Sequence, residues 1–175
     1  MLDLEINKII REVTDFPKKG ISFKDITPLL MEKEISDKIV SEFIRRIKNL
    51  KIDAIVGIES RGFLYGFLLA NKLGIPFIPI RKSGKLPCKT LKYKYNLEYG
   101  SSEVEIHKND IQRDWNILIH DDLLATGGTA CAAAELIKLS GANVAGFTFI
   151  VSLNYLKPFK KLEQYSSEII TLVEY

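Results

Sequence analysis

Two acidic residues followed by a loop of small residues form the most chemically informative stretch of this sequence. Asp121 and Asp122 stand at the end of an apolar run that begins at Ile117. The loop that follows contains Ala125, Thr126, Gly127, Gly128 and Thr129. Glycine lets a backbone approach a ligand closely, threonine hydroxyls donate hydrogen bonds, and the exposed N–H groups at a helix start favour an anion such as phosphate. Because the two carboxylates would repel phosphate, they suit sugar hydroxyls or a Mg²⁺ ion, and the stretch predicts a site for both phosphate and sugar.

Other glycine-containing phosphate loops do not fit this stretch. No lysine follows Gly127 and Gly128, which argues against a P-loop, and the spacing lacks the three glycines of a dinucleotide-binding turn. A glycine pair alone is common in ordinary turns, so the prediction depends on the whole pattern of apolar run, acids, loop and helix start.

Two further segments carry charged residues just after short apolar runs. One holds Ser60 and Arg61 after the run 52–58, and the other is basic and follows the run 77–80. The basic residues are Arg81, Lys82 and Lys85. A run of charges taken alone is usually a solvated surface, but arginine offers planar donors and a permanent charge to a phosphate. Since both segments follow predicted strands at the same sheet edge, the pattern favours the binding of a small polyanion.

The elements that must position these residues alternate between strands and helices. The sequence predicts strands at 52–58, 77–80, 117–119, 144–153 and 168–173, and helices at 3–13, 36–49, 63–73 and 129–139. This alternation is typical of α/β proteins, in which ligands bind beyond the carboxyl ends of parallel strands. We therefore expect a single α/β domain over residues 1–175, with a mostly parallel twisted sheet flanked by helices. Residues 91–107 alternate differently and predict an antiparallel excursion or mobile flap outside the main sheet.

Composition narrows the class of protein and its partners. The chain has 175 residues, of which 46% are hydrophobic and 27% charged, as in ordinary globular domains. Its net charge of +3 is a weak footprint for nucleic acid, and its apolar stretches are too short to span a membrane. The sequence has no secretory signal, and Cys88 and Cys131 are interpreted as free thiols of a reducing compartment rather than metal ligands. We therefore expect a cytoplasmic protein with no nucleic-acid or membrane partner.

Taken together, these motifs resemble a known enzyme family. Residues 117–129 are similar to the signature with which type I phosphoribosyltransferases bind 5-phosphoribosyl-1-diphosphate (PRPP). Further segments resemble the adenine-specific members in order and spacing: Asp15-Phe16-Pro17, Gly20, 23–29, Ser60-Arg61-Gly62-Phe63, 80–82 with 84–87, and Leu97-Glu98-Tyr99-Gly100. The resemblance covers residues 15–155 and implies the type I fold, with an N-terminal base-binding hood at 1–34 and a flexible flap at 85–107.

The resemblance implies roles for the residues around the diphosphate and the sugar. Arg61 would neutralise the leaving diphosphate with Ser60 beside it, and the peptide bond between Glu59 and Ser60 would be cis. The basic residues after 77–80 would contact the same diphosphate, within the chain or across a dimer interface. The acidic pair and the small-residue loop would bind the rest of PRPP. Mg²⁺ is expected near the acidic pair, held mainly through PRPP.

The resemblance assigns the purine to two other segments. Phe23 would lie against the base, and backbone groups near Ser22 and Lys24 would read its edge. Many relatives carry arginine at position 24, so the role of this position stays open between a backbone contact and a pairing of the side chain with a carboxylate. Glu98, with Tyr99 beside it in the flap, would act as the acid/base on the purine.

The reaction implied by the resemblance is a step of purine salvage. PRPP and adenine would give AMP and diphosphate, with Mg²⁺ required and a homodimer expected. One alternative is a phosphoribosyltransferase for hypoxanthine, guanine or xanthine. The other is a regulatory protein that senses PRPP, which the small net charge and the absence of room for a second domain disfavour.

His120 departs from the family, which usually carries an aliphatic residue at this position. Successive side chains of a strand point to opposite faces, so His120, Asp121 and Asp122 cannot all converge on one metal ion. We therefore expect His120 to pack against a neighbouring element.

Overall fold

The computed structural model describes residues 1–16, 18–96 and 101–175. Its strands are β1 Arg11–Val13, β2 Phe23–Asp25, β3 Ala54–Ile58, β4 Phe77–Lys82, β5 Thr90–Asn96, β6 Ser101–His107, β7 Asn116–Leu124, β8 Asn143–Ser152 and β9 Ile169–Glu174. Its helices are α1 Leu2–Ile9, α2 Lys33–Ile47, α3 Gly62–Leu73, α4 Gly128–Leu139 and α5 Phe159–Leu162. Two short 3₁₀ helices, η1 Thr27–Met31 and η2 Asn154–Leu156, complete the described elements.

The main sheet has seven strands in the order β5-β6-β4-β3-β7-β8-β9. The five strands from β4 to β9 in this order are parallel to their neighbours, which confirms the predicted α/β fold with a mostly parallel sheet. The hairpin of β5 and β6 was expected to stand outside this sheet, and that expectation is wrong. β6 pairs antiparallel with the end of β4, through Arg81 opposite Glu105 and Lys82 opposite Val104, so the hairpin extends the sheet at its edge.

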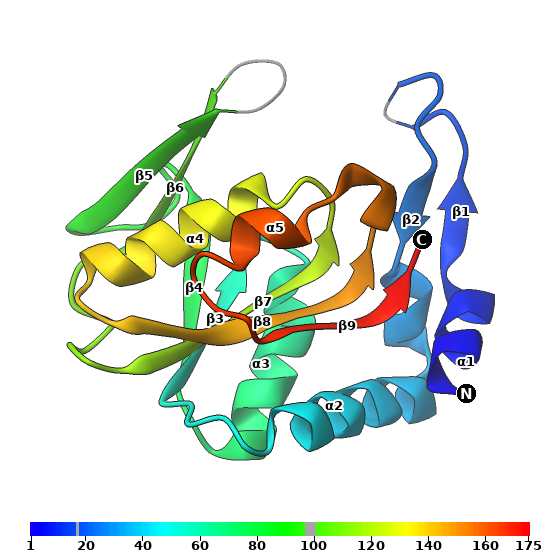
Figure 1. Cartoon of the computed structure of the whole chain (residues 1–175), viewed down its shortest axis with the longest axis horizontal. Coiled ribbons are helices and arrows are strands. Elements are labelled where there is room, and N and C mark those ends of the chain that lie inside the picture. Colours follow the sequence, from blue (N-terminus) through cyan, green and yellow to red (C-terminus); the bar gives the residue numbers. More distant parts are fainter. Residues whose placement is uncertain (17, 97–100) are drawn as a thin grey trace.

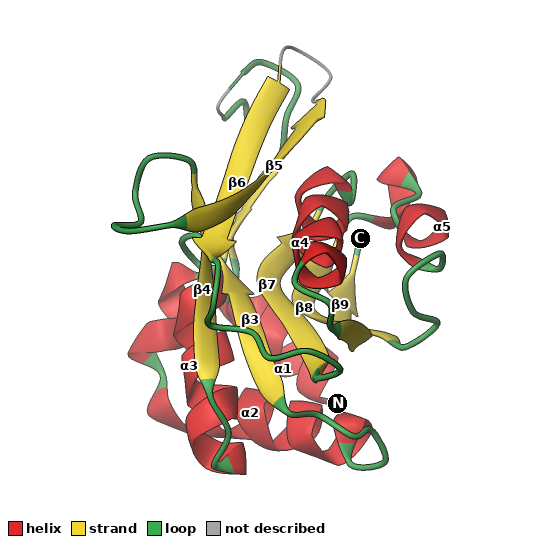
Figure 2. Cartoon of the chain, turned by 90° about the vertical axis from the view of Figure 1, so that its left-hand side faces the viewer, coloured by secondary structure: helices red, strands yellow, loops and turns green. Residues whose placement is uncertain are grey.

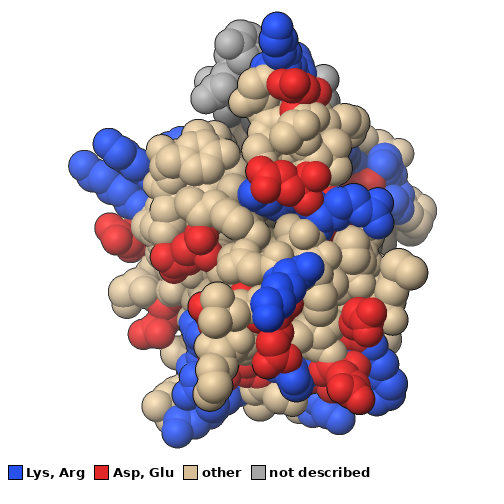
Figure 3. Space-filling model, turned by 90° about the vertical axis from the view of Figure 1, so that its right-hand side faces the viewer, with Lys and Arg blue, Asp and Glu red and all other residues tan. Residues whose placement is uncertain are grey.

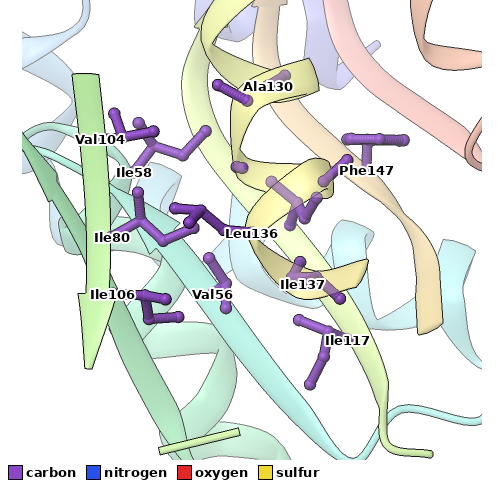
Figure 4. Packing of buried hydrophobic residues seen from close by; sticks show 14 of the residues in the cluster. Val56, Ile58, Ile80, Val104, Ile106, Ile117, Ala130, Leu136, Ile137 and Phe147 are labelled. Atoms are coloured by element: carbon purple, nitrogen blue, oxygen red, sulfur yellow. The ribbon is translucent and has the colours of Figure 1, made fainter. Parts of the chain in front are cut away.

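Helices cover both faces of the sheet. α1, α2 and α3 lie on one face, and α4 and α5 lie on the other, as the edge-on view of Figure 2 shows. Because alternate side chains of a strand point to opposite faces, β3 contributes Val56 to the core under α4 and Ile55 to the core under α2 and α3. Figure 4 shows Val56 and Ile117 packed against Leu136 and Ile137 of α4. The two cores fix α3 and α4, whose first residues directly follow the motifs found in the sequence.

The N-terminal segment differs from the predicted helix over 3–13. α1 ends at Ile9, and the next residues form β1, which pairs with β2 in a separate two-stranded sheet. The register sets Glu12 opposite Lys24 and Val13 opposite Phe23. Pairing across the chain therefore overrides the helical periodicity after Ile10. Figure 1 shows this hairpin and the β5–β6 hairpin at opposite sides of the molecule.

Candidate active site

The predicted site segments meet at one edge of the sheet. β3, β4 and β7 are adjacent and parallel, so their carboxyl ends lie side by side. β3 is followed by Glu59 and Ser60, β4 ends in Arg81 and Lys82, and β7 contains the acidic pair. The bond between Glu59 and Ser60 is cis, as the family resemblance implies.

The small-residue loop lines a hollow between β7 and α4. The hollow has a volume of about 80 Å³, and its lining includes Asp121, Ala125, Thr126, Gly127, Gly128 and Thr129. Gly127 has a φ of +79°, a left-handed conformation that favours glycine, and it directly precedes the first residue of α4. The start of α4 therefore presents its free N–H groups to the hollow, which suits a phosphate group.

α5 and the segment before it hold this loop from behind. The Lys161 ammonium donates a hydrogen bond to the Thr126 carbonyl oxygen at 3.1 Å. A Cβ atom on Gly127 would lie 3.4 Å from the Pro158 carbonyl oxygen, so the loop packs closely on this segment. Lys161 was not expected from the sequence, because it follows the loop by more than thirty residues in a region without a motif.

The two acidic residues have different surroundings. Asp122 is 3% exposed, and its Oδ2 lies 2.9 Å from Nε of Arg61. Burial raises the pKa of Asp122, and the charge of Arg61 opposes that shift. Asp121 is partly exposed, lines the hollow and accepts a hydrogen bond from the Asp122 backbone N–H at 2.9 Å. Burial, followed by the negative charge of Asp122, raises the pKa of Asp121 well above its usual range. Asp121 is thus the carboxyl group that lines the hollow, and Asp122 holds Arg61.

Arg61 connects the main sheet to the N-terminal hairpin. Its guanidinium carbon lies 5.0 Å from the centre of the Phe23 ring, a cation–π contact, while its Nε pairs with Asp122. The Phe16 ring also contacts the Phe23 ring edge-on, with ring centres 5.2 Å apart. The predicted base platform and the predicted sugar site are therefore joined by one side chain.

Gly62 makes this approach of α3 to β7 feasible. A Cβ atom at Gly62 would lie 2.8 Å from the His120 carbonyl oxygen and 2.9 Å from Oδ1 of Asp121. Both distances are shorter than non-bonded contacts allow, so a side chain here would push α3 and Arg61 away from the acidic pair.

Comparison with known proteins identifies the family. Residues 23–170 match the model of the phosphoribosyl transferase domain. The chain is 49% identical over 175 residues to adenine phosphoribosyltransferase of Desulfitobacterium hafniense, with full coverage of both, and 47% identical over 172 residues to that of Christiangramia forsetii, covering 98% and 99% of the two chains. The crystal structure of the Thermoanaerobacter pseudethanolicus enzyme superposes with a TM-score of 0.95 at 44% identity, covering both chains fully. The chain belongs to the adenine phosphoribosyltransferase family.

Glu59 holds the basic segment of Arg81, Lys82 and Lys85, which the family resemblance places at the diphosphate. This role of Glu59 is not evident from the sequence. Glu59 accepts hydrogen bonds at Oε2 from the Lys82 backbone N–H at 2.9 Å and from Nε of Arg81 at 3.2 Å, and it also pairs with the Lys85 ammonium. Burial works against ionisation of Glu59, but Lys85, Lys82 and Arg81 outweigh it and lower the pKa of this carboxyl. The Arg81 guanidinium and the Lys85 ammonium therefore converge on Glu59, which also fixes the backbone of Lys82.

A second buried carboxylate shapes the same loop. Glu105 of β6 is 1% exposed and accepts hydrogen bonds from the backbone N–H groups of Lys85 and Leu86, both at 2.9 Å. This role is not evident from the sequence, because a glutamate between Val104 and Ile106 is expected on the solvent side of an alternating strand.

Lys24 points away from the base platform of the family. Its side chain pairs with Glu12 at 3.1 Å and lies over the Tyr175 ring, 4.2 Å from the ring centre. The side chain at position 24 therefore pairs with a carboxylate, one of the two options that the sequence left open. Its neighbour Phe23 points to the opposite side, toward Arg61.

The flap reaches the phosphate loop through a residue that the motif did not include. Tyr95 of β5 has its hydroxyl 3.2 Å from Oγ1 of Thr129, and its ring borders Gly128. Glu98 and Tyr99, the predicted acid/base and its neighbour, lie outside the described residues.

His120 is not part of the site. It is fully buried on β7, its Nδ1 lies 3.0 Å from Oγ1 of Thr148, and its ring meets Phe43 of α2 edge-on. This placement confirms the expectation that His120 packs against neighbouring elements.

Proposed function

We propose that this protein transfers the 5-phosphoribosyl group from PRPP to adenine, giving AMP and diphosphate, as a step of purine salvage. The proposal is supported by the family, by a yeast relative crystallised with adenine and by a Trypanosoma brucei relative crystallised with AMP, pyrophosphate and ribose-5-phosphate. The observation that carries it is Arg61, which lies between the aromatic face of Phe23 and the buried carboxylate of Asp122. This arrangement supports the proposal, because an aromatic face suited to a flat base lies close to acidic side chains suited to sugar hydroxyls.

In the proposed reaction, a ring nitrogen of adenine bonds to C1 of the ribose as the C1–O bond to diphosphate breaks. The loop 125–129 would hold the 5-phosphate, and Asp121 would hold the ribose hydroxyls. Arg61, Arg81, Lys82 and Lys85 would receive the charge that develops on the diphosphate, with Ser60 beside them. Phe23 and the backbone around Lys24 would orient the base. Glu98 would take the proton that adenine loses, with Tyr99 beside it in the flap.

Mg²⁺ fits this site as a partner of PRPP rather than of the protein alone. The residues in 1–16, 18–96 and 101–175 include no group of three or more His, Cys, Asp or Glu side chains that could hold a metal ion. Asp122 already pairs with Arg61, which leaves Asp121 as the carboxylate in the hollow. One carboxylate together with substrate phosphates is a usual environment for Mg²⁺. When bound, the ion would screen the negative charge of PRPP.

The protein is further proposed to be a cytoplasmic homodimer. α3 carries Leu64, Phe67 and Leu68 on one exposed face, with exposed fractions of 40%, 55% and 42%, and it begins directly after Arg61. An apolar face of this kind at helical spacing suits a second copy of the chain. The thiols of Cys88 and Cys131 are free, as in proteins of a reducing compartment. The face seen in Figure 3 carries basic and acidic side chains side by side, so it offers no continuous basic surface to nucleic acid.

The test is a panel of bases. The purified protein is mixed with PRPP and Mg²⁺ and then, separately, with adenine, hypoxanthine, guanine, xanthine and orotate, and nucleotide and diphosphate are measured. AMP from adenine alone is expected. Replacing the guanidinium in Arg61→Gln should lower kcat/KM by about 100-fold, because a partly buried charged donor is lost at the developing charge. Arg45→Gln removes an exposed arginine of α2 and serves as the matched control, expected to match the wild type.

The other outcomes each point to a different function. Product from another base would keep the family and overturn the adenine assignment. Binding of PRPP without product from any base would instead favour a PRPP-sensing regulator.

A further inference from the structure

Lys24 is a nearly buried cation beside the residue proposed to carry the base. Its side chain is 11% exposed, and its ammonium lies between the Glu12 carboxylate at 3.1 Å and the Tyr175 ring face at 4.2 Å. Glu12 belongs to the neighbouring strand of the same hairpin, where it is the register partner of Lys24. Tyr175 comes from the opposite end of the sequence and lies at the end of β9.

Tyr175 is held in place by the main body of the protein. Its backbone N–H donates to the Ser152 carbonyl oxygen at 2.9 Å, and its carbonyl oxygen accepts from the Asn154 N–H at 2.7 Å. Its hydroxyl donates to Oδ1 of Asn7 in α1 at 2.5 Å. The ring is therefore a fixed surface, attached to the end of β8 and to α1, against which the ammonium of Lys24 rests.

The direction of Phe23 follows from the position of Lys24. The two residues are adjacent in β2, so their side chains point to opposite sides of the strand. With Lys24 held on Tyr175, Phe23 faces Arg61, whose guanidinium lies 5.0 Å from the ring centre. β1 and β2 pair with each other in a sheet separate from the main one, so side-chain contacts of this kind set the angle of the hairpin.

We propose that Tyr175, acting through Lys24, is a positioning residue for the purine: it holds the β1–β2 hairpin so that Phe23 faces the base. This inference rests on the proposed function, and it assigns Tyr175 a part in base binding only. The residues proposed for PRPP follow β3, lie on or just after β4, lie on β7, or belong to the loop before α4. Arg61 among them contacts the hairpin through Phe23, but its Nε is held by Asp122 of β7. Loss of the Tyr175 ring should therefore weaken binding of adenine and leave that of PRPP unchanged.

The experiment compares steady-state constants of Tyr175→Leu, Tyr175→Phe and the wild type. Tyr175→Leu removes the ring face and should raise KM for adenine by about three- to tenfold, between the worth of an exposed and of a fully desolvated cation–π contact, with KM for PRPP unchanged. Tyr175→Phe keeps the ring and should largely restore KM for adenine. Tyr165→Leu is the matched control, because Lys138 lies over the Tyr165 ring in the same way at 5.4 Å, far from the hairpin. It should leave both KM values as in the wild type.

Two further variants keep the test decisive if Tyr175→Leu folds poorly. Glu12→Gln removes the other partner of the ammonium at an exposed carboxylate, and it should raise KM for adenine selectively. Lys24→Met should raise KM for adenine as Tyr175→Leu does, and the double variant should be no worse than either, because both remove the same contact.

The inference would be overturned if folded Tyr175→Leu kept the wild-type KM for adenine, or if both KM values rose together. Additive effects in the double variant would also contradict it. These outcomes are separate from a failure of the proposed function, because the wild type is first shown to turn over a base, and the comparison then uses the KM for that base.

Discussion

At the scale of single residues, Arg61 shows how one side chain can serve two halves of a site. Its Nε is occupied by Asp122, while the flat guanidinium lies over Phe23 and keeps terminal N–H groups for a ligand. A lysine could offer neither the fork of donors nor the flat surface. The resemblance predicted Arg61 as a diphosphate ligand. The structure adds that the same residue ties the N-terminal hairpin to the sheet, so its loss would affect the base platform as well as the leaving group.

His120 carries a prediction about stability. Burial lowers its pKa to about 3, against an ordinary value of 6.5, and among the described residues Nε2 has no hydrogen-bond partner. The folded protein therefore keeps His120 neutral at pH values where the unfolded chain binds a proton. The contribution of neutral His120 to the unfolding free energy is present in full above pH 6.5. It is lost as the pH falls toward 3, at about 1.4 kcal/mol per pH unit.

Replacement by the aliphatic residue usual in the family should remove this dependence. Between pH 7 and pH 5, the unfolding free energy of the wild type should fall by about 2 kcal/mol more than that of His120→Leu. Urea unfolding at the two pH values measures the difference. Parallel curves for the two proteins would contradict the prediction, because they would mean that the pKa of His120 is the same in the folded and the unfolded protein.

The sequence singles out the residues proposed to bind the ligands but not the residues that support them. The acids, the glycine loop and Arg61 could be found because their types are unusual after an apolar run. Glu59 and Glu105 look like ordinary surface glutamates in the sequence. The pairing of β3 with β4 brings Glu59 to the loop after β4, and the pairing of β4 with β6 brings Glu105 there. Such contacts depend on register between distant strands, which local patterns do not encode.

At the scale of elements, the β5–β6 hairpin and the loop before α4 are joined by Tyr95. Its hydroxyl lies 3.2 Å from Oγ1 of Thr129, one of the hydroxyls proposed to bind phosphate. Tyr95→Phe should therefore raise KM for PRPP by about fivefold, the worth of one neutral hydrogen bond, and should leave KM for adenine unchanged. This is the reverse of the pattern expected for Tyr175.

Tyr93 provides the control for that measurement. It lies two residues earlier on the same strand, so Tyr93→Phe removes a hydroxyl from the same hairpin without touching Thr129. Equal effects of the two variants on KM for PRPP would mean that the hairpin acts through its overall stability rather than through this contact.

Elements with strong periodicity were predicted to within a few residues. The helix expected at 63–73 is Gly62–Leu73, and that expected at 129–139 is Gly128–Leu139. The wrong predictions fall in segments whose structure depends on pairing with a strand elsewhere in the sequence. Residues 11–13 pair with β2 instead of extending α1, and β6 joins β4 instead of leaving the sheet. In both places short strands gain their stability from a partner that the local sequence does not name.

At the scale of the whole molecule, the two faces of the sheet are covered differently. The α4 face carries a helix with many buried alanines, which packs close to the strands. On the other face, α3 buries Tyr65 and Leu69 and turns Leu64, Phe67 and Leu68 outward. Exposed apolar side chains at positions i, i+3 and i+4 form a continuous stripe on a helix. This stripe lies on the helix that begins directly after Arg61. A second copy of the chain that covers the stripe would therefore bring the two candidate active sites together as well as joining the two chains.

The proposed homodimer can be tested through this stripe. Sedimentation of the wild type should give the mass of two chains, and Leu68→Glu should shift the protein toward one chain, because a buried unpaired charge strongly opposes association. Phe67→Glu should act in the same way, although Phe67 also meets the Phe77 ring at 6.0 Å and its loss affects the fold. Leu139→Glu places the same charge on a residue that is 59% exposed at the end of α4, and it should leave the mass unchanged. A wild type with the mass of one chain, or a Leu68→Glu variant that stays dimeric, would rule out α3 as the interface.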